Sequence, residues 1–136
     1  VGFPGETDQD FEESMMLLET VRYHSSFSFK YSDRPGTRSA AFDTKVDETV
    51  QSDRLSRFQD LQNRISLERN KEYVNSTLNI VVEGLGKNNL FYGRSETNHI
   101  VHFPAAAGKK PRVGDMLCVH IRHAGRHSLT GTIAGE

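Results

Sequence analysis

Cysteine is nearly absent from this sequence, because Cys118 is the only one among 136 residues. A single thiol excludes an internal disulfide framework, and one cysteine with scattered histidines matches no paired spacing of zinc ligands. No stretch reaches the roughly 18 apolar residues that a membrane-spanning helix needs, and no secretory signal peptide is recognisable. We therefore expect a cytoplasmic protein with no metal site and no membrane partner.

Catalytic signatures are missing as well. Serine, histidine and aspartate are scattered along the chain without a nucleophile elbow. The segment Gly2–Thr7 has glycines before an expected helix, but it lacks the Gly-Lys-Ser/Thr of a P-loop and the spacing of a dinucleotide fingerprint. A plain strand-to-helix turn is the favoured interpretation, and no catalytic residue is predicted within this chain.

Neither sign of charge predominates overall, since the net charge is -1, but the two parts of the chain differ in their charge. Residues 1–70 contain 9 Lys and Arg against 13 Asp and Glu, whereas residues 71–136 contain 8 against 5 and five of the six histidines. An acidic part followed by a basic part indicates that the C-terminal part meets a polyanion.

The first 31 residues have the pattern of a β-α-β unit. Val1–Phe3 is typical of the end of a buried strand, and Thr7 with Asp10 forms a capping box at the start of a helix that continues to about residue 22. Alternation over residues 27–31 predicts a second strand. Because such units contain parallel strands, we expect the end of an α/β barrel and a chain that is part of something larger.

A long helix is predicted from an Asp47 N-cap to about Tyr73, followed by five short strands. The expected strands are Thr77–Glu83, Leu90–Arg94, His99–Phe103, Met116–His123 and Ser128–Ala134. In the fourth, Val119 and Ile121 are expected to face inward and His120 and Arg122 outward. Five strands in about 60 residues indicate a small, closed, OB-like antiparallel barrel with a basic exterior.

The barrel carries cations, imidazoles, an amide and aromatic rings, which is the combination that single-stranded RNA binding uses. The residues we expect to contact RNA are Phe91, Arg94, Asn98, His99, His102, Phe103, Lys109, Lys110, Arg112, Arg122, Arg126 and His127. The alternative is that these polar residues only keep the barrel soluble and bind no RNA.

Several short motifs occur in a specific order along the chain. They are Val1–Thr7, Phe27–Ser32, Arg34–Thr37, Leu61–Ser66, Gly93–Ser95, Asn98–Phe103 and His127–Gly131. In this order they resemble the MiaB-type tRNA methylthiotransferases, which are radical-SAM enzymes with an appended TRAM domain, and the resemblance covers essentially all 136 residues.

The resemblance implies an α+β fragment in three parts. Residues 1–42 would be the end of a partial radical-SAM barrel, residues 43–70 a linking helix, and residues 71–136 an RNA-binding TRAM barrel. The family's reaction places a methylthio group on C2 of N6-isopentenyladenosine beside the tRNA anticodon. It uses S-adenosylmethionine and two [4Fe–4S] clusters, each held by three cysteines, so this chain is expected to bind no cofactor by itself and to be inactive alone. The expected partner is the tRNA anticodon arm rather than DNA, and the expected state is a monomer.

The resemblance also assigns residues to the edge of an active site. Those expected near S-adenosylmethionine are Val1, Gly2, Phe3, Pro4 and Phe29. Those expected near the substrate adenosine are Lys30, Tyr31 and Arg34.

Three other functions stay open on the sequence alone. A sibling family that modifies an aspartate of a ribosomal protein shares the Gly2–Thr7 segment and a TRAM domain, although Phe29–Ser32 and Asn98–Phe103 are more similar to the tRNA branch. The chain could also be a stand-alone RNA-binding module, or its barrel could bind protein as adaptor barrels do.

Overall fold

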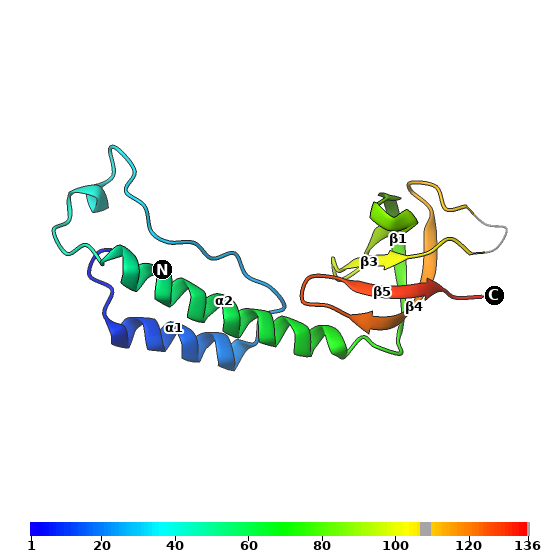
Figure 1. Cartoon of the computed structure of the whole chain (residues 1–136), viewed down its shortest axis with the longest axis horizontal. Coiled ribbons are helices and arrows are strands. Elements are labelled where there is room, and N and C mark those ends of the chain that lie inside the picture. The colour runs from blue at the N-terminus through cyan, green and yellow to red at the C-terminus, as the bar shows by residue number, and fades with distance from the viewer. Residues whose placement is uncertain (107–109, 136) are drawn as a thin grey trace. The chain divides into compact units, whose positions relative to one another are not determined.

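The computed structural model describes residues 1–106 and 110–135 and divides the chain into two compact units (Figure 1). Unit 1 comprises Val1–Ser66 and unit 2 comprises Leu67–Glu136. The division falls inside helix α2 (Glu48–Lys71), whose 24 residues therefore contribute to both.

Helix α1 (Asp8–Val21) begins as its sequence predicts. The Thr7 hydroxyl accepts a hydrogen bond from the Asp10 backbone N–H at 3.1 Å, and the Asp10 carboxylate accepts one from the Thr7 backbone N–H at 2.8 Å, which completes the capping box. The helix ends at Arg22, which adopts a left-handed conformation and donates its N–H to the Leu18 carbonyl. Phe11 and Leu18 form its buried face.

Helix α2 begins after Asp47, which is confirmed as its cap. The Asp47 carboxylate accepts a hydrogen bond from the Thr49 backbone N–H at 2.8 Å, and hydrogen bonds from the Thr49 hydroxyl and N–H lower the pKa of Asp47. Along α2 an apolar stripe meets α1. The core of unit 1 consists of Leu18, Leu61 and Ile65, with Met15 and Phe58 packed against it.

The two strands expected within residues 1–31 are not formed as regular strands. Val1 donates its N–H to the Phe29 carbonyl at 3.0 Å, and Tyr31 donates to the Val1 carbonyl at 2.8 Å, which is the pattern of a single parallel bridge. The Phe3 carbonyl, which is the next one on the same side of the extended chain, instead accepts from the Glu6 N–H at 2.9 Å as the chain turns. The pairing is therefore parallel as expected, but it ends after one bridge. A short 3-10 turn, η1 (Arg38–Ala41), follows.

Unit 2 is a closed five-stranded barrel, and the predicted fold class is confirmed. Its elements are β1 (Thr77–Leu85), η2 (Lys87–Asn89), β2 (Phe91–Ser95), β3 (Ile100–Phe103), β4 (Met116–Ala124) and β5 (Leu129–Ile133). The strands are ordered β1-β2-β3-β5-β4 around the barrel. Four of the neighbouring pairs are antiparallel, whereas β3 and β5 are parallel, so the barrel departs from the purely antiparallel arrangement that we expected.

The barrel interior is filled by inward-facing residues from every strand. Its buried core consists of Ile80, Val82, Phe91, Val101, Phe103, Val119, Ile121 and Leu129. Two inward positions are glycines where strands approach closely: a Cβ on Gly93 would lie 2.2 Å from the Val81 carbonyl oxygen, and one on Gly131 would lie 2.3 Å from the His120 carbonyl oxygen. The predicted inward positions of Val119 and Ile121 are confirmed.

Candidate functional site

The turn at the start of the chain is fixed by side chains of α2. Gly2 has a φ of 79° and is buried, its N–H donates to the Glu6 carboxylate at 3.0 Å, and its carbonyl accepts from Gln51 Nε2 at 2.9 Å. Arg54, only 5% exposed, donates to Glu6 Oε1 at 2.8 Å and to Asp8 Oδ1 at 2.7 Å. The hydrogen bond to Asp8, followed by that to Glu6, raises the pKa of Arg54 above its ordinary value. The turn is thus held rigidly by protein contacts.

The residues expected near S-adenosylmethionine are brought together in unit 1. Gly2 and Pro4 are buried. The ring of Phe3 meets that of Tyr31 edge-on at a centroid distance of 5.2 Å, and the backbone of Val1 pairs with that of Phe29. Phe3 is 50% exposed and Phe29 is 71% exposed, so both present apolar ring surface to the outside of unit 1.

Lys30 and Arg34, two of the residues expected near the substrate, have different surroundings. Lys30 Nζ forms an ion pair with Glu48 Oε1 at 3.1 Å and donates to Ser52 Oγ at 3.3 Å, so it is engaged with the first turns of α2. The Arg34 side chain is exposed, and its carbonyl accepts from the Thr37 hydroxyl at 2.8 Å.

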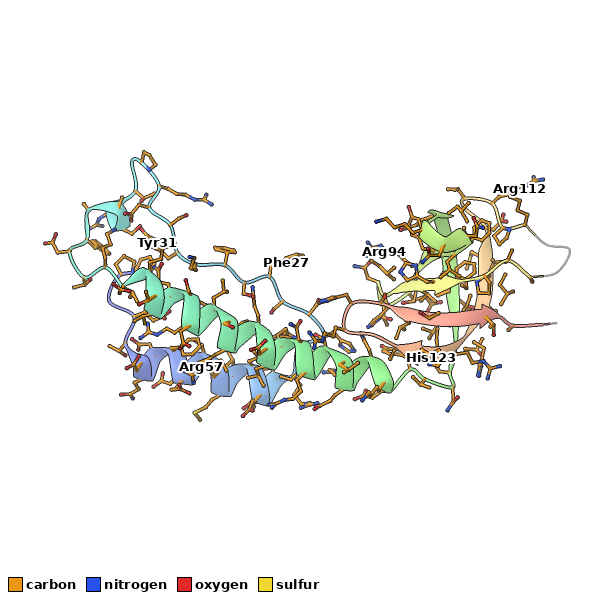
Figure 2. The ribbon with its side chains drawn as sticks, viewed as in Figure 1. Phe27, Tyr31, Arg57, Arg94, Arg112 and His123 are labelled. Carbon is orange, nitrogen blue, oxygen red and sulfur yellow. The ribbon has the colours of Figure 1, made fainter. Side chains whose placement is uncertain are left out.

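Tyr31, the third of these residues, is the centre of a polar cluster (Figure 2). Its hydroxyl lies 3.0 Å from both Asp33 Oδ1 and Ser39 Oγ. Lys45 pairs with the same Asp33 carboxylate and donates to the Ser39 carbonyl at 2.9 Å. Hydrogen bonds from Lys45 and then Tyr31 lower the pKa of Asp33. This network fixes the loop that contains Arg34.

The Leu61–Ser66 motif has a structural role in unit 1. Gln62 Nε2 donates to the Tyr23 carbonyl at 2.8 Å, and Ser66 Oγ donates to the His24 carbonyl at 2.6 Å. Both side chains are buried, so they hold the backbone that follows α1 against α2.

Two aromatic residues expected to stack on RNA lie instead inside the barrel. Phe91 is 7% exposed and Phe103 is 0% exposed, and their rings stack on each other at 6.3 Å. Because strand residues alternate, their neighbours Tyr92 and His102 face outward and lie side by side with ring centroids 6.5 Å apart. A Cβ on Gly84 would lie 3.1 Å from the Tyr92 ring, so this glycine leaves room for the ring. The outward aromatic is Tyr92, which our sequence-based set of contacts omitted.

Arg94, which is labelled in Figure 2, forms an ion pair and a hydrogen bond with neighbouring residues of the barrel. Its Nε lies 3.3 Å from Glu83 Oε1, and its Nη1 donates to Asn98 Oδ1 at 3.0 Å. Asn98 is exposed in a left-handed conformation. The half-buried His99 ring packs against Tyr73 at 4.7 Å. Of these expected contact residues, Arg94 and Asn98 therefore support each other, whereas His99 contacts Tyr73.

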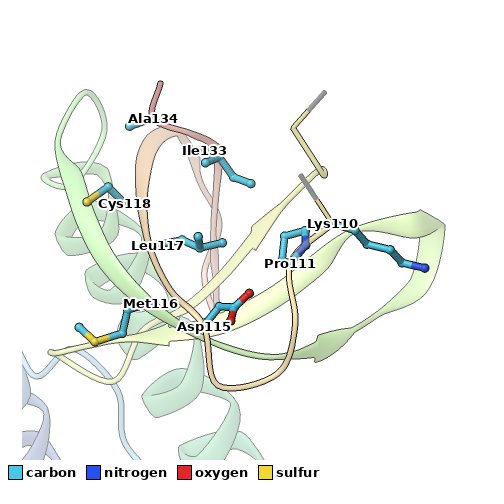
Figure 3. Close-up of a pocket in the computed structure, with 8 residues that line it drawn as sticks. All are labelled: Lys110, Pro111, Asp115, Met116, Leu117, Cys118, Ile133 and Ala134. Atoms are coloured by element: carbon cyan, nitrogen blue, oxygen red, sulfur yellow. The ribbon is translucent and has the colours of Figure 1, made fainter. Parts of the chain in front are cut away.

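Lys110 and Arg112 precede β4 and are exposed (Figure 2), whereas Lys109 lies outside the described residues. The Arg112 backbone N–H donates to Asp115 Oδ2 at 2.8 Å. A cavity of about 390 Å³ opens beside this loop (Figure 3). It is lined by Lys110, Pro111, Asp115, Met116, Leu117, Cys118, Ile133 and Ala134.

The remaining expected contacts lie in the β4–β5 hairpin. Arg122, Arg126 and His127 are all exposed, as is His123 (Figure 2). Over residues 1–106 and 110–135, no acidic side chain forms an ion pair with Arg122 or Arg126. Their charge is therefore not offset by a neighbour in this part of the chain.

Two further features are absent from the described residues. No three His, Cys, Asp or Glu side chains of residues 1–106 and 110–135 come together as they would around a metal ion. Among the helices of the same residues, none combines the length and the apolar character that a bilayer crossing requires.

Comparison with known proteins finds relatives that are similar to both units. Residues 71–134 match the TRAM domain. The chain is 56% identical over 136 residues to a tRNA-2-methylthio-N(6)-dimethylallyladenosine synthase of Desulfotalea psychrophila, covering all of this chain and 30% of that relative. Proteins of the same name from Thermobifida fusca and Clostridium botulinum (strain Hall) are 40% and 42% identical over 95% and 96% of the chain, and the match covers 27% and 29% of their lengths.

The chain thus spans less than a third of the length of these curated relatives. The similarity nevertheless runs through both compact units, including the capped helices and the barrel. Over its whole length the chain is therefore similar to one part of the tRNA-2-methylthio-N(6)-dimethylallyladenosine synthases, and its residues 71–134 form a TRAM domain.

Proposed function

We propose that this chain is part of an enzyme that places a methylthio group on C2 of an N6-isopentenyladenosine beside the tRNA anticodon. The observation that carries the proposal is the 56% identity over all 136 residues to the synthase of Desulfotalea psychrophila. The enzyme would be a cytoplasmic monomer whose nucleic-acid partner is tRNA rather than DNA.

Each part of the chain has its own task in this proposal. Residues 71–136 bind the anticodon arm, residues 43–70 form the linking helix, and residues 1–42 form an edge of the active site. Near that edge, the exposed rings of Phe3 and Phe29 offer apolar surface beside S-adenosylmethionine, and the exposed Arg34 lies on a fixed loop nearer the substrate.

The residues of this chain do not fit an iron–sulfur cluster. Such clusters are held by several cysteine thiolates, and the chain contains only Cys118, which is exposed on β4. We therefore assign both [4Fe–4S] clusters and the radical chemistry to other parts of the enzyme, and we expect these 136 residues to bind RNA without catalysing.

A chimera tests the proposal directly. This chain replaces the matching part of the Desulfotalea psychrophila relative, and the tRNA of cells that make the chimera is digested to nucleosides and analysed by mass spectrometry. We expect 2-methylthio-N6-isopentenyladenosine in amounts similar to those made by the intact relative. The relative lacking this part serves as the control and should give little product. A chimera that is folded and carries its clusters but makes no methylthio product would contradict the proposal.

A further inference from the structure

The tip of the β4–β5 hairpin concentrates groups that can bind an anion. Four of the six residues from 122 to 127 are Arg122, His123, Arg126 and His127, and all four are exposed. The same six positions contain no acidic residue and no Phe, Tyr or Trp. The tip therefore suits the phosphates of a nucleic-acid backbone better than the faces of its bases.

A β-bulge explains how two neighbouring basic residues come to be exposed together. In the register of β4 with β5, Ile121 pairs with Gly131 and His123 pairs with Thr130, so Arg122 is the extra residue. A bulge interrupts the alternation of a strand and redirects a side chain. Arg122 and His123 are consecutive residues, yet both are exposed.

The loop beyond the bulge is held by a buried amide. Asn70, in the last turn of α2, is only 4% exposed. Its Nδ2 donates to the Gly125 carbonyl at 2.8 Å and to the Arg126 carbonyl at 3.3 Å. The amide nitrogen thus donates to two consecutive carbonyls of the loop, and the Gly125 N–H in turn donates to the Ser128 carbonyl at 2.8 Å.

We propose that the hairpin tip, Arg122–His127, binds the phosphate backbone of the RNA, and that Asn70 is a positioning residue that fixes this tip. The proposal rests on the RNA-binding function proposed above and deepens it by naming one binding surface. Arg122 and Arg126 form no ion pair among residues 1–106 and 110–135. Arg94, by contrast, has Glu83 at 3.3 Å and Asn98 at 3.0 Å.

The test measures the dissociation constant of the full 136-residue chain for a tRNA anticodon stem-loop at several salt concentrations between roughly 50 and 200 mM. The double variant R122A/R126A should bind roughly tenfold more weakly at low salt, and its salt slope should fall by about 1.5, since each lost phosphate contact removes about 0.7–0.9. The variant K87A is the control, and its affinity should change by less than about twofold because Lys87 is an exposed cation on η2, outside the hairpin tip.

The role of Asn70 is separated from general stability by a double-mutant cycle. N70A should weaken RNA binding severalfold, but it should add little to R122A/R126A, because the loop that it positions no longer carries its cations. N70D keeps the shape of the side chain, removes the donor and should weaken binding at least as much. Thermal midpoints of all variants show whether the barrel is intact.

Several results would overturn this inference while the proposed function stands. These are RNA binding by R122A/R126A with the affinity and salt slope of the unmodified chain, an equal loss in K87A, or equal affinity for poly-L-glutamate, which would indicate an acidic protein surface as the partner. Full additivity of N70A with R122A/R126A would refute the positioning role. Failure of the unmodified chain to bind the stem-loop even at low salt would instead refute the proposed RNA-binding function itself.

Discussion

Gly93 on β2 leaves no space for a side chain. A Cβ at this position would lie 2.2 Å from the Val81 carbonyl oxygen and 2.7 Å from Cγ2 of Ile80. The variant G93A should therefore lower the free energy of unfolding of the barrel by at least roughly 1–3 kcal/mol, the usual effect of overpacking. Denaturant titration followed by circular dichroism measures it. G135A is the control, since no described atom lies within 4 Å of its Cβ; equal stability of the two variants would contradict the structure.

At the same scale, the predicted set of RNA contacts does not take into account that inward and outward positions alternate along each strand. Phe91 and Arg94 are three positions apart on one strand, so they must face opposite sides of it, yet both were expected to contact RNA. The strict period of two would have identified Tyr92 as the outward aromatic. By contrast, the bonds of Asn70 to the hairpin loop join residues 55 and 56 positions apart, and no local pattern predicts them.

At the scale of elements, the start of α1 depends on one threonine. Hydrogen bonds from the Thr7 backbone and then the Thr7 hydroxyl lower the pKa of Asp10. Because the folded-state pKa is lowered, the stability from this contact is complete above the usual aspartate pKa of about 4 and is lost as the pH falls through the lowered value. The variant T7V should therefore raise the pKa of Asp10 toward its usual range, and the first turn of α1 should fray more readily.

The carboxyl shift of Asp10, followed by NMR through an acid titration, measures this effect. T20V is the matched control, because the Thr20 hydroxyl donates to the Met16 carbonyl at 2.8 Å within the same helix and is not a partner of Asp10. An Asp10 pKa that is unchanged in T7V, or shifted equally in T20V, would show that the Thr7 hydroxyl is not one of its causes.

Elements whose ends depend on neighbouring residues were predictable, and pairings between distant residues were less so. The caps Thr7 and Asp47 contact backbone N–H groups two or three positions away, so their roles could be inferred from local sequence. The parallel pairing of β3 with β5 joins Val101 to Leu129, and it depends on how the barrel closes rather than on either strand alone. The parallel pairing near Val1 ends after one bridge because the Glu6 N–H donates to the Phe3 carbonyl.

At the scale of the whole molecule, the two compact units have separate cores of unequal size. Among the residues that the structure describes, eight buried ones form the core of the barrel, three form that of the helical unit, and none belongs to both. Since stability increases with buried apolar surface, the barrel should be the more stable unit. Amide hydrogen exchange is expected to be slower at Val119 and Ile121 than at Leu61 and Ile65.

Two core variants decide whether the units unfold independently. I121A and L61A each remove a buried aliphatic side chain, and each should lower the stability of its own unit by about 3 kcal/mol. If the units are independent, I121A accelerates exchange throughout the barrel and leaves the amides around Leu18 unchanged, while L61A does the reverse. Equal acceleration across all 136 residues in either variant would mean that α2, which contributes to both units, couples them into one cooperative unit. Independent unfolding is the outcome that the separate cores predict, and it would allow the barrel to keep its proposed RNA-binding surface when the helical unit opens.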